Sequence, residues 1–287
     1  MKRFFTLMAG TAVIAAMAAC GTDASADQTS GQDTSQTSSA AVSEGEPVEL
    51  TVFAAASMTE TMEEIADLYA QVAPNVTIIY TFDSSGTLAT QIEEGADCDL
   101  FISAAPKQMN QIDINGGEDN TDGLDFVLED TRIDLLENKV VLVTADNSDS
   151  GITSFEDLTT DKLEMLCIGN EDVPVGDYSL KILDYLGTSA QELESQGKLT
   201  YGSNVKEVTT QVSEGVVDCG IIYATDAFSA GLTPVDEATA EMCGQVIYPA
   251  AVMKNSENIE AAKAFLEYLQ GDEASAVFES VGFTPLT

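Results

Sequence analysis

Short apolar runs alternate with longer segments of helical periodicity from residue 48 to the end of the chain. The runs at 49–55, 76–82 and 99–103 predict strands, and the segment 87–94 predicts a helix between two of them. A helix is also predicted over 58–73, because apolar residues recur there every three or four positions on one face: Met58, Met62, Ile65, Tyr69 and Val72. This strand-then-helix order is typical of a parallel α/β sheet.

The second part of the chain repeats the pattern after a helix-like segment around Leu135. Its apolar runs predict strands at 139–144, 165–168, 198–201, 216–223 and 245–253. Its helices are predicted to begin at Pro174, near Ser203, near Ile259 and at Asp272. The first has an apolar face with Leu180, Ile182, Leu183 and Leu186, and the second has one with Val205, Val208 and Val212. The third has an apolar face with Ile259, Ala262, Phe265, Leu266 and Leu269. Two blocks of about 90 to 110 residues account for these elements better than one domain with a long sheet, which stays an alternative.

The first 47 residues have a different composition. Lys2 and Arg3 precede an apolar run over 4–19, which is shorter than the roughly 20 residues that a membrane helix needs. This layout predicts a secretory signal peptide over 1–19, and an uncleaved membrane anchor is the alternative. Cys20 follows two small residues and resembles the cysteine of a bacterial lipobox, which implies lipidation of Cys20 after cleavage. Residues 20–47 are too polar to bury a core, so they predict a disordered tether.

The formal net charge is −38, and loss of Lys2 and Arg3 with the signal peptide would make the chain two charges more negative. Such an acidic surface repels nucleic acid and anionic lipid head groups, so neither is expected as a partner, and the lipid anchor is the only expected link to a membrane. Repulsion of a small anion is screened beyond about 10 Å at ordinary salt, so donors close to the ligand can still hold it.

The sequence contains no histidine, which excludes Ser-His-Asp and Cys-His nucleophiles as well as histidine metal ligands. It also contains no phosphate-binding loop of the G-x-x-x-x-G-K-[ST] or G-x-G-x-x-G type. A serine with a lysine base stays possible, but no S-x-x-K lies at a predicted strand-to-helix turn. We therefore expect a protein that is not an enzyme and uses no cofactor.

Four cysteines follow Cys20, and outside the membrane they could pair in three ways. None has the spacing of a zinc site, and Cys98 and Cys219 each precede an apolar strand. These positions favour buried free thiols for Cys98, Cys167, Cys219 and Cys243.

Helix amino ends recur behind the predicted strands. Ser57 follows the run 49–55 and forms an S-x-x-E pattern with Glu60, which predicts a capping box. Similar helix starts lie at 84–87, 173–176 and 203–205. In a parallel sheet such ends gather at the carboxyl edge of the strands, and each offers unpaired N–H groups with a partial positive charge. Ordinary helix caps are one interpretation, and a pocket of neutral donors for a fully ionised oxyanion is the other.

Five separate segments resemble the molybdate-binding proteins of ABC transporters: VFAAAS at 52–57, TFDSSGTLATQIEEGADCDLFISA at 81–104, DVPVG at 172–176, GIIYATDA at 220–227 and VGFT at 281–284. They follow the order of that family, and the resemblance covers nearly all of 48–287. It implies an α/β, two-lobed, periplasmic-binding-protein-like fold, with mixed sheets flanked by helices and the ligand in the interlobe cleft. Residues 48–138 plus 247–287 would form one lobe, and 139–246 the other.

The resemblance also implies which residues hold the ligand. Ser57 and Ser85 would donate through hydroxyl and backbone N–H groups, Val175 and Val205 through backbone N–H groups, and Tyr223 through its phenol. The ligand would be molybdate, and tungstate as well, held through its oxygens without direct protein ligands to the metal. The expected protein is a monomeric lipoprotein on the outer face of the bacterial cell membrane, which delivers the anion to the permease and ATPase of an ABC importer.

Several alternatives stay open at this point. Sulfate or phosphate could be the ligand, and a serine-dependent extracellular enzyme or a surface adhesin would belong to other classes. Two positions depart from the family, which usually has a small residue in place of Asp83 and often a serine in place of Gly86. Because side chains alternate at a strand end, Asp83 is expected to point away from the ligand. The chain also looks a few residues longer than its relatives around 188–199.

Overall fold

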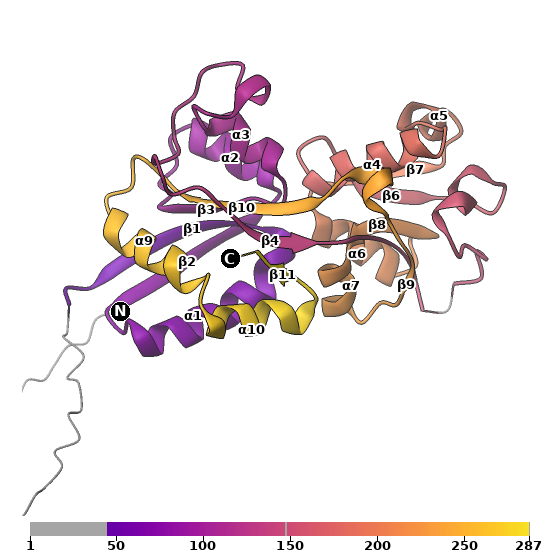
Figure 1. Ribbon diagram of the computed structural model, residues 1–287. Coiled ribbons are helices and arrows are strands. Elements are labelled where there is room, and N and C mark those ends of the chain that lie inside the picture. The colour runs from indigo at the N-terminus through magenta and orange to yellow at the C-terminus, as the bar shows by residue number, and fades with distance from the viewer. Residues whose placement is uncertain (1–44, 147, 287) are drawn as a thin grey trace, which may run out of the picture. The chain divides into compact units, whose positions relative to one another are not determined.

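The computed structural model describes residues 45–146 and 148–286. The predicted signal peptide over 1–19, Cys20 and most of the predicted tether over 20–47 lie outside these ranges. The described part is built on two mixed β-sheets flanked by helices (Figure 1). The α/β class and the mixed character of the sheets, both predicted, are confirmed.

The first sheet has six strands, and its centre is parallel while one side is antiparallel. β1 pairs in parallel with β2 and β3, and β10 runs antiparallel to both of its neighbours. In spatial order the strands are β11 (Thr284–Pro285), β4 (Ile133–Asn138), β10 (Val246–Val252), β3 (Leu100–Ile102), β1 (Val48–Ala55) and β2 (Val76–Asp83).

Helices cover both faces of this sheet because the side chains of β1 alternate between two apolar clusters. Phe53 packs with Leu88 and Met109 of the helices on one face, whereas Val52 belongs to the cluster of Met62 on the other. The first face carries α2 (Ser85–Glu93) and α3 (Pro106–Ile112), and the second carries α1 (Thr59–Val72), α9 (Ile259–Tyr268) and α10 (Asp272–Val281) (Figure 1). The 3-10 turns η1 (Ala56–Met58) and η2 (Gly117–Asp119) complete this half.

The second sheet has five strands and is also mixed. β6 pairs in parallel with β7 and β8, while β5 runs antiparallel to β8 and β9. In spatial order the strands are β7 (Leu199–Gly202), β6 (Leu166–Gly169), β8 (Cys219–Tyr223), β5 (Val140–Thr144) and β9 (Pro234–Glu237). The helices are α4 (Pro174–Tyr185), α5 (Ala190–Ser195), α6 (Val205–Ser213), α7 (Ala224–Ala230) and α8 (Ala240–Cys243), with the 3-10 turn η3 (Phe155–Thr159).

The chain passes between the two sheets twice. The first crossing is Lys139, between β4 and β5, and the second follows β9 through α8 into β10. We call the parts built on the two sheets the six-stranded half and the five-stranded half. The limits of the two lobes, at 48–138 plus 247–287 and 139–246, stay a prediction.

Some elements differ from the sequence-based prediction. The segment around Leu135 is a strand, β4, and not a helix; β4 lies between two other strands and buries Leu135 and Leu136, so its short apolar run lacks the alternation of a half-exposed strand. Val72 and Leu180 are 57% and 43% exposed, so neither belongs to the buried face of its helix. β8 begins at Cys219 and not at Val216. The short elements α3, α5, α7, α8, β9 and β11 were not predicted.

The four cysteines of the described ranges are free and buried, which confirms the prediction for Cys98, Cys167, Cys219 and Cys243. No helix within 45–146 or 148–286 is both long and apolar enough to cross a membrane.

Candidate functional site

Helix amino ends from both halves meet at one small cavity. About 10 Å³ of this cavity is accessible to the centre of a water molecule. The wall consists of strand ends and helix starts: Ala55, Ala56, Ser57, Asp83, Ser84, Ser85 and Ala104 from the six-stranded half, and Val173, Pro174, Val205 and Tyr223 from the five-stranded half. Four of the five residues assigned to the ligand by resemblance are therefore neighbours here, although they are far apart in the sequence.

Ser57 lies in the turn η1, which connects β1 to α1, and is 4% exposed. Its Oγ is 3.0 Å from the Oη of Tyr248, and it does not cap α1, whose N-cap is Met58. Glu60 does not return to the backbone of Ser57 but pairs with Lys206 at 2.7 Å. The predicted capping box is therefore wrong, because the additional 3-10 turn places Ser57 before the helix start.

Ser85 is the first residue of α2 and is fully buried. Its neighbour Ser84 caps the helix by accepting a hydrogen bond from the Thr87 N–H at 3.1 Å. Because Ser84 performs this role, the hydroxyl of Ser85 stays available; its Oγ accepts from the Ala104 N–H at 2.9 Å. The lone pair that faces Ala104 is occupied, so the Ser85 proton is left for another acceptor.

The five-stranded half contributes backbone N–H groups. Val205 is the first residue of α6, behind the N-cap Asn204, and Val175 is the second residue of α4, behind the N-cap Val173. N–H groups in a first helical turn have no acceptor within their own helix. Val175 is buried but is not part of the cavity wall, which contains Val173 and Pro174 before it.

Tyr223 ends β8 and is 1% exposed. Its hydroxyl donates to the carbonyl of Ala104 in the other half, at a long distance of 3.4 Å. Burial raises the pKa of Tyr223 well above its usual value, so the phenol keeps its proton and can donate. A stronger acceptor in the cavity could replace this long hydrogen bond.

Donors outnumber charges at the cavity. Among the residues that form its wall there is no lysine or arginine, so the hydroxyl and backbone N–H groups are neutral donors. Asp83 also belongs to the wall, and its Oδ1 accepts from the Ser84 N–H at 2.7 Å. That its side chain points away from the ligand stays a prediction. Within the described ranges no group of three or more acidic or cysteine residues could hold a metal ion.

Contacts between the two halves surround the cavity. The Gly86 N–H donates to the Asp172 carbonyl at 2.9 Å. Lys107 pairs with Asp177 at 2.9 Å, and Lys206 of α6 pairs with Glu60 of α1. These contacts hold the halves together over the site, as in a closed form.

Two buried polar residues beside Ser57 carry no signal in the sequence. Tyr248 in β10 lies within hydrogen-bonding distance of Ser57, and Asn138 at the end of β4 donates to Tyr248 at 3.1 Å. Tyr248 has the position of an ordinary strand residue, and only the pairing of β10 with β4 brings it to Asn138. Asp226, just after the Tyr223 motif, is likewise buried, and neither carboxylate oxygen has a hydrogen-bond partner in the described part of the chain.

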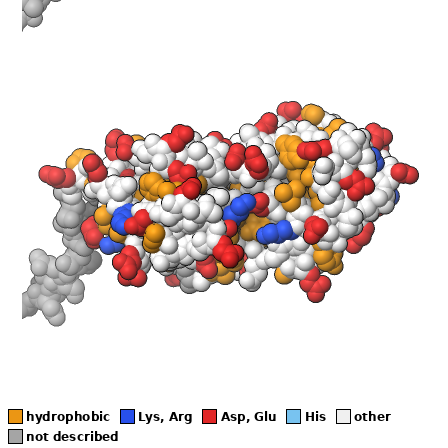
Figure 2. All heavy atoms as spheres, turned by 90° about the horizontal axis from the view of Figure 1, so that it is seen from above, with side chains coloured by type: hydrophobic (Ala, Val, Ile, Leu, Met, Phe, Trp, Pro, Cys, Tyr) orange, Lys and Arg blue, Asp and Glu red, His pale blue; other side chains and the backbone are white. Residues whose placement is uncertain are grey.

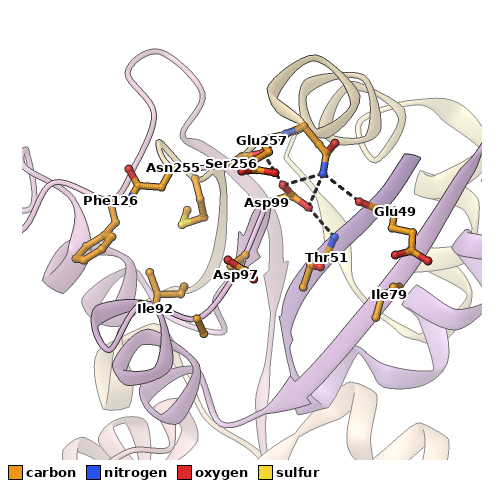
Figure 3. Close-up of a pocket in the computed structure, with 15 residues that line it drawn as sticks. Glu49, Thr51, Ile79, Ile92, Asp97, Asp99, Phe126, Asn255, Ser256 and Glu257 are labelled. Atoms are coloured by element: carbon orange, nitrogen blue, oxygen red, sulfur yellow. Dashed lines mark hydrogen bonds between the residues drawn. The ribbon is translucent and has the colours of Figure 1, made fainter. Parts of the chain in front are cut away.

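A larger hollow of about 440 Å³ lies elsewhere in the six-stranded half and is lined by Glu49, Asp97 and Glu257 (Figure 3). Its central carboxylate, Asp99, accepts from the Thr51 N–H at 2.7 Å and also binds Ser256, so it is occupied with joining strand and loop. The acidic lining repels anions. Figure 2 shows acidic side chains spread over the visible face as well, with basic side chains at only a few places.

Two sheets joined by two crossings, with a cavity of helix amino ends between them, define the class of two-lobed solute-binding proteins. The comparisons with known proteins agree. The sequence model of the family described as bacterial extracellular solute-binding protein matches residues 50–284, and the chain belongs to this family. This is a family of binding proteins and not of enzymes.

Three relatives illustrate the similarity. YvgL of Bacillus subtilis, provisionally named as an ABC transporter substrate-binding lipoprotein, is 38% identical over 239 residues, with 83% of this chain and 86% of that protein covered. The molybdate-binding protein ModA of Haemophilus influenzae is 31% identical over 240 residues, with 82% and 89% covered. A solved substrate-binding domain from Clostridium difficile, provisionally titled as part of a molybdenum ABC transporter, has 35% identity and a TM-score of 0.61, with 84% of this chain and 100% of that chain covered.

Proposed function

We propose that this protein binds molybdate, and tungstate as well, outside the cell membrane and delivers it to an ABC importer. The observation that carries the proposal is the cavity of neutral donors at Ser57, Ser85, Val205 and Tyr223. The name of the Haemophilus influenzae relative supports the choice of molybdate.

A fully ionised tetrahedral oxyanion suits this cavity because it only accepts hydrogen bonds. Ser57 and Ser85 would donate from the six-stranded half, and Val175, Val205 and Tyr223 from the five-stranded half. An anion held from both sides makes more contacts in the closed form than in the open one, so binding favours closure. No covalent step and no resident cofactor are involved.

The cellular setting follows from the same family. We propose that Cys20 is lipidated after removal of residues 1–19 and anchors a monomer to the outer face of the membrane, where a permease and an ATPase receive the anion. The name of YvgL as a lipoprotein supports the anchor.

Calorimetric titration with molybdate, tungstate, sulfate and phosphate tests the ligand. We expect molybdate and tungstate to bind more tightly than sulfate, and phosphate to bind least, because hydrogen phosphate needs an acceptor for its proton. Tighter binding of sulfate than of molybdate would contradict the proposal.

Two substitutions test the residues. Ser57→Ala and Tyr223→Phe should each weaken molybdate binding by about 1.5 to 3 kcal/mol, the range for a hydrogen bond to a charged group. Ser213→Ala is a matched control, because that hydroxyl donates to the Thr209 carbonyl within α6 and does not line the cavity. Unchanged molybdate affinity in both site variants would contradict the residue assignment.

A further inference from the structure

The direction of the hydrogen bond between Ser57 and Tyr248 decides what Ser57 can offer a ligand. Oxygen atoms 3.0 Å apart in two hydroxyls leave open which one donates. If Ser57 donates to Tyr248, it can only accept from a ligand. If Tyr248 donates to Ser57, the Ser57 proton is free for an oxyanion.

A backbone N–H group fixes this direction through Asn138. The Lys139 N–H can only donate, and it lies 2.8 Å from one side-chain atom of Asn138, which must therefore be the carbonyl Oδ1. The amide nitrogen Nδ2 then faces the other way. It donates one hydrogen to Thr225 Oγ1 at 2.9 Å and the other to Tyr248 Oη at 3.1 Å.

Tyr248 Oη thus accepts from Asn138 and has one proton of its own to donate. Burial raises the pKa of Tyr248 well above its usual value, so this proton is kept. Ser57 Oγ, at 3.0 Å, is the hydroxyl that meets hydrogen-bond geometry with Tyr248, and the Tyr223 hydroxyl is a further neighbour. The geometry therefore favours donation from Tyr248 to Ser57. Ser57 accepts this bond and keeps its own proton for the cavity.

Ring packing holds Tyr248 in place for this role. The residue is fully buried in β10, and its ring makes edge contacts with Tyr223 at 5.6 Å and with Phe283 at 5.2 Å between centroids. Phe283 belongs to the C-terminal motif that contributes no residue to the cavity wall. Its contact with Tyr248 gives that motif a structural link to the site.

We propose that Tyr248, oriented by Asn138, is a positioning residue that fixes the Ser57 hydroxyl as a donor and thereby selects fully deprotonated oxyanions over protonated ones. This inference rests on the proposed oxyanion function. Ser85 shows the same arrangement, since its Oγ accepts from the Ala104 N–H. The two serine hydroxyls assigned to the ligand are then both oriented to donate.

Tyr248→Phe removes the hydroxyl and keeps the ring. We expect molybdate affinity to fall by about tenfold, close to the loss of one hydrogen bond to a charged group. The ratio of molybdate affinity to hydrogen phosphate affinity should fall as well, because the freed Ser57 oxygen can accept a proton from phosphate. A purely structural role of Tyr248 would weaken both anions in equal proportion and leave this ratio unchanged.

A double-mutant cycle with Ser57→Ala gives the sharper test. If Tyr248 acts through the Ser57 hydroxyl, Tyr248→Phe should cause no further loss of molybdate affinity in the Ser57→Ala background. Tyr178→Phe is the matched control: Tyr178 is also a buried tyrosine in contact with the Tyr223 ring, but its hydroxyl faces the Gln245 carbonyl. It should leave both the affinity and the ratio unchanged.

Each outcome bears on a different claim. Additive losses in the cycle, or an unchanged anion ratio, would overturn the role of Tyr248 while the binding function stands. A wild-type protein that binds no oxyanion would overturn both. If Tyr248→Phe does not fold, as judged by circular dichroism, Asn138→Ala in the same cycle tests the direction of the hydrogen bond between Tyr248 and Ser57. We expect Asn138→Ala to reduce molybdate affinity less than Tyr248→Phe in the wild-type background, and to cause no further loss in the Ser57→Ala background.

Discussion

Burial of the Asp226 carboxylate lowers the stability of the folded protein when the group is ionised. Substitution by asparagine should therefore stabilise the protein above neutral pH. The side chain is fully buried in the first turn of α7, and its nearest cation, Lys206 Nζ, is 3.5 Å away and also pairs with Glu60. The pKa of Asp226 is raised from 3.8 to about 7, mainly by burial and also by the charge of Glu60, although Lys206 and a backbone hydrogen bond act to lower it.

The direction of the pH dependence follows from the linkage between proton binding and folding. The folded chain binds this proton more tightly than the unfolded chain, so the contribution of Asp226 to stability is complete below the unfolded pKa and is lost as the pH rises through the folded pKa. A shift of about three units, at 1.36 kcal/mol each, corresponds to about 4 kcal/mol in the free energy of unfolding. Asp226→Asn carries no charge, so it avoids this loss.

Urea denaturation of wild type and Asp226→Asn at about pH 5 and about pH 8 measures the effect. The variant should gain stability relative to wild type between the two pH values, by a few kcal/mol. Lys206→Met serves as a companion variant, because loss of the nearby cation should raise the pKa of Asp226 and move the midpoint of the pH dependence upward. A difference between wild type and Asp226→Asn that is the same at both pH values would refute the reasoning.

Two further predictions concern closure and the thiols. A Cβ atom at residue 86 would lie 2.5 Å from the Asp172 carbonyl oxygen, so Gly86→Ala should disturb the contact between the halves and weaken molybdate binding. Gly95→Ala is the comparison: its Cβ meets no atom within 4 Å, and its positive φ of 93° should cost stability but leave molybdate affinity unchanged. Equal molybdate affinities of Gly86→Ala and wild type in calorimetry would contradict this role of Gly86. Burial raises the pKa of the Cys167 thiol to about 12, so iodoacetamide should modify Cys167 only after unfolding; rapid labelling of the native protein in mass spectrometry would contradict the burial.

Much of the fold could be predicted from the sequence because its strands and helices carry strong periodic patterns. The helix over 58–73 was found through the spacing of Met62, Ile65 and Tyr69, which are buried in α1. β4 was not found, since a short apolar strand between two others has no polar alternation. The short helices and strands that were not predicted span at most seven residues each, too few for a clear period.

The site was accessible to sequence reasoning only in part. Helix starts behind strands pointed to Ser57 and Ser85, and the family resemblance added Tyr223, which by itself looks like the end of a buried strand. Asn138 and Tyr248 carry no local signal, because their contact depends on the pairing of two strands more than a hundred positions apart. The 3-10 turn at Ser57 was also invisible, since S-x-x-E fits a capping box equally well.

The acidic character of the chain can coexist with an anion site because each of three carboxyl groups near the cavity has a local interaction or a raised pKa that reduces its repulsion of an anion. Glu60 is paired with Lys206, and Asp83 Oδ1 accepts from the Ser84 N–H. Asp226 is buried, and its raised pKa of about 7 means that a large fraction is protonated at neutral pH. Apart from Asp83, the polar groups of the cavity wall are neutral hydroxyl and backbone N–H groups. Under the proposed assignment, such donors would discriminate between oxyanions by the number of protons that the anion carries rather than by its net charge. This explains why a protein with a net charge of −38 can hold a dianion without a cationic side chain in the cavity wall.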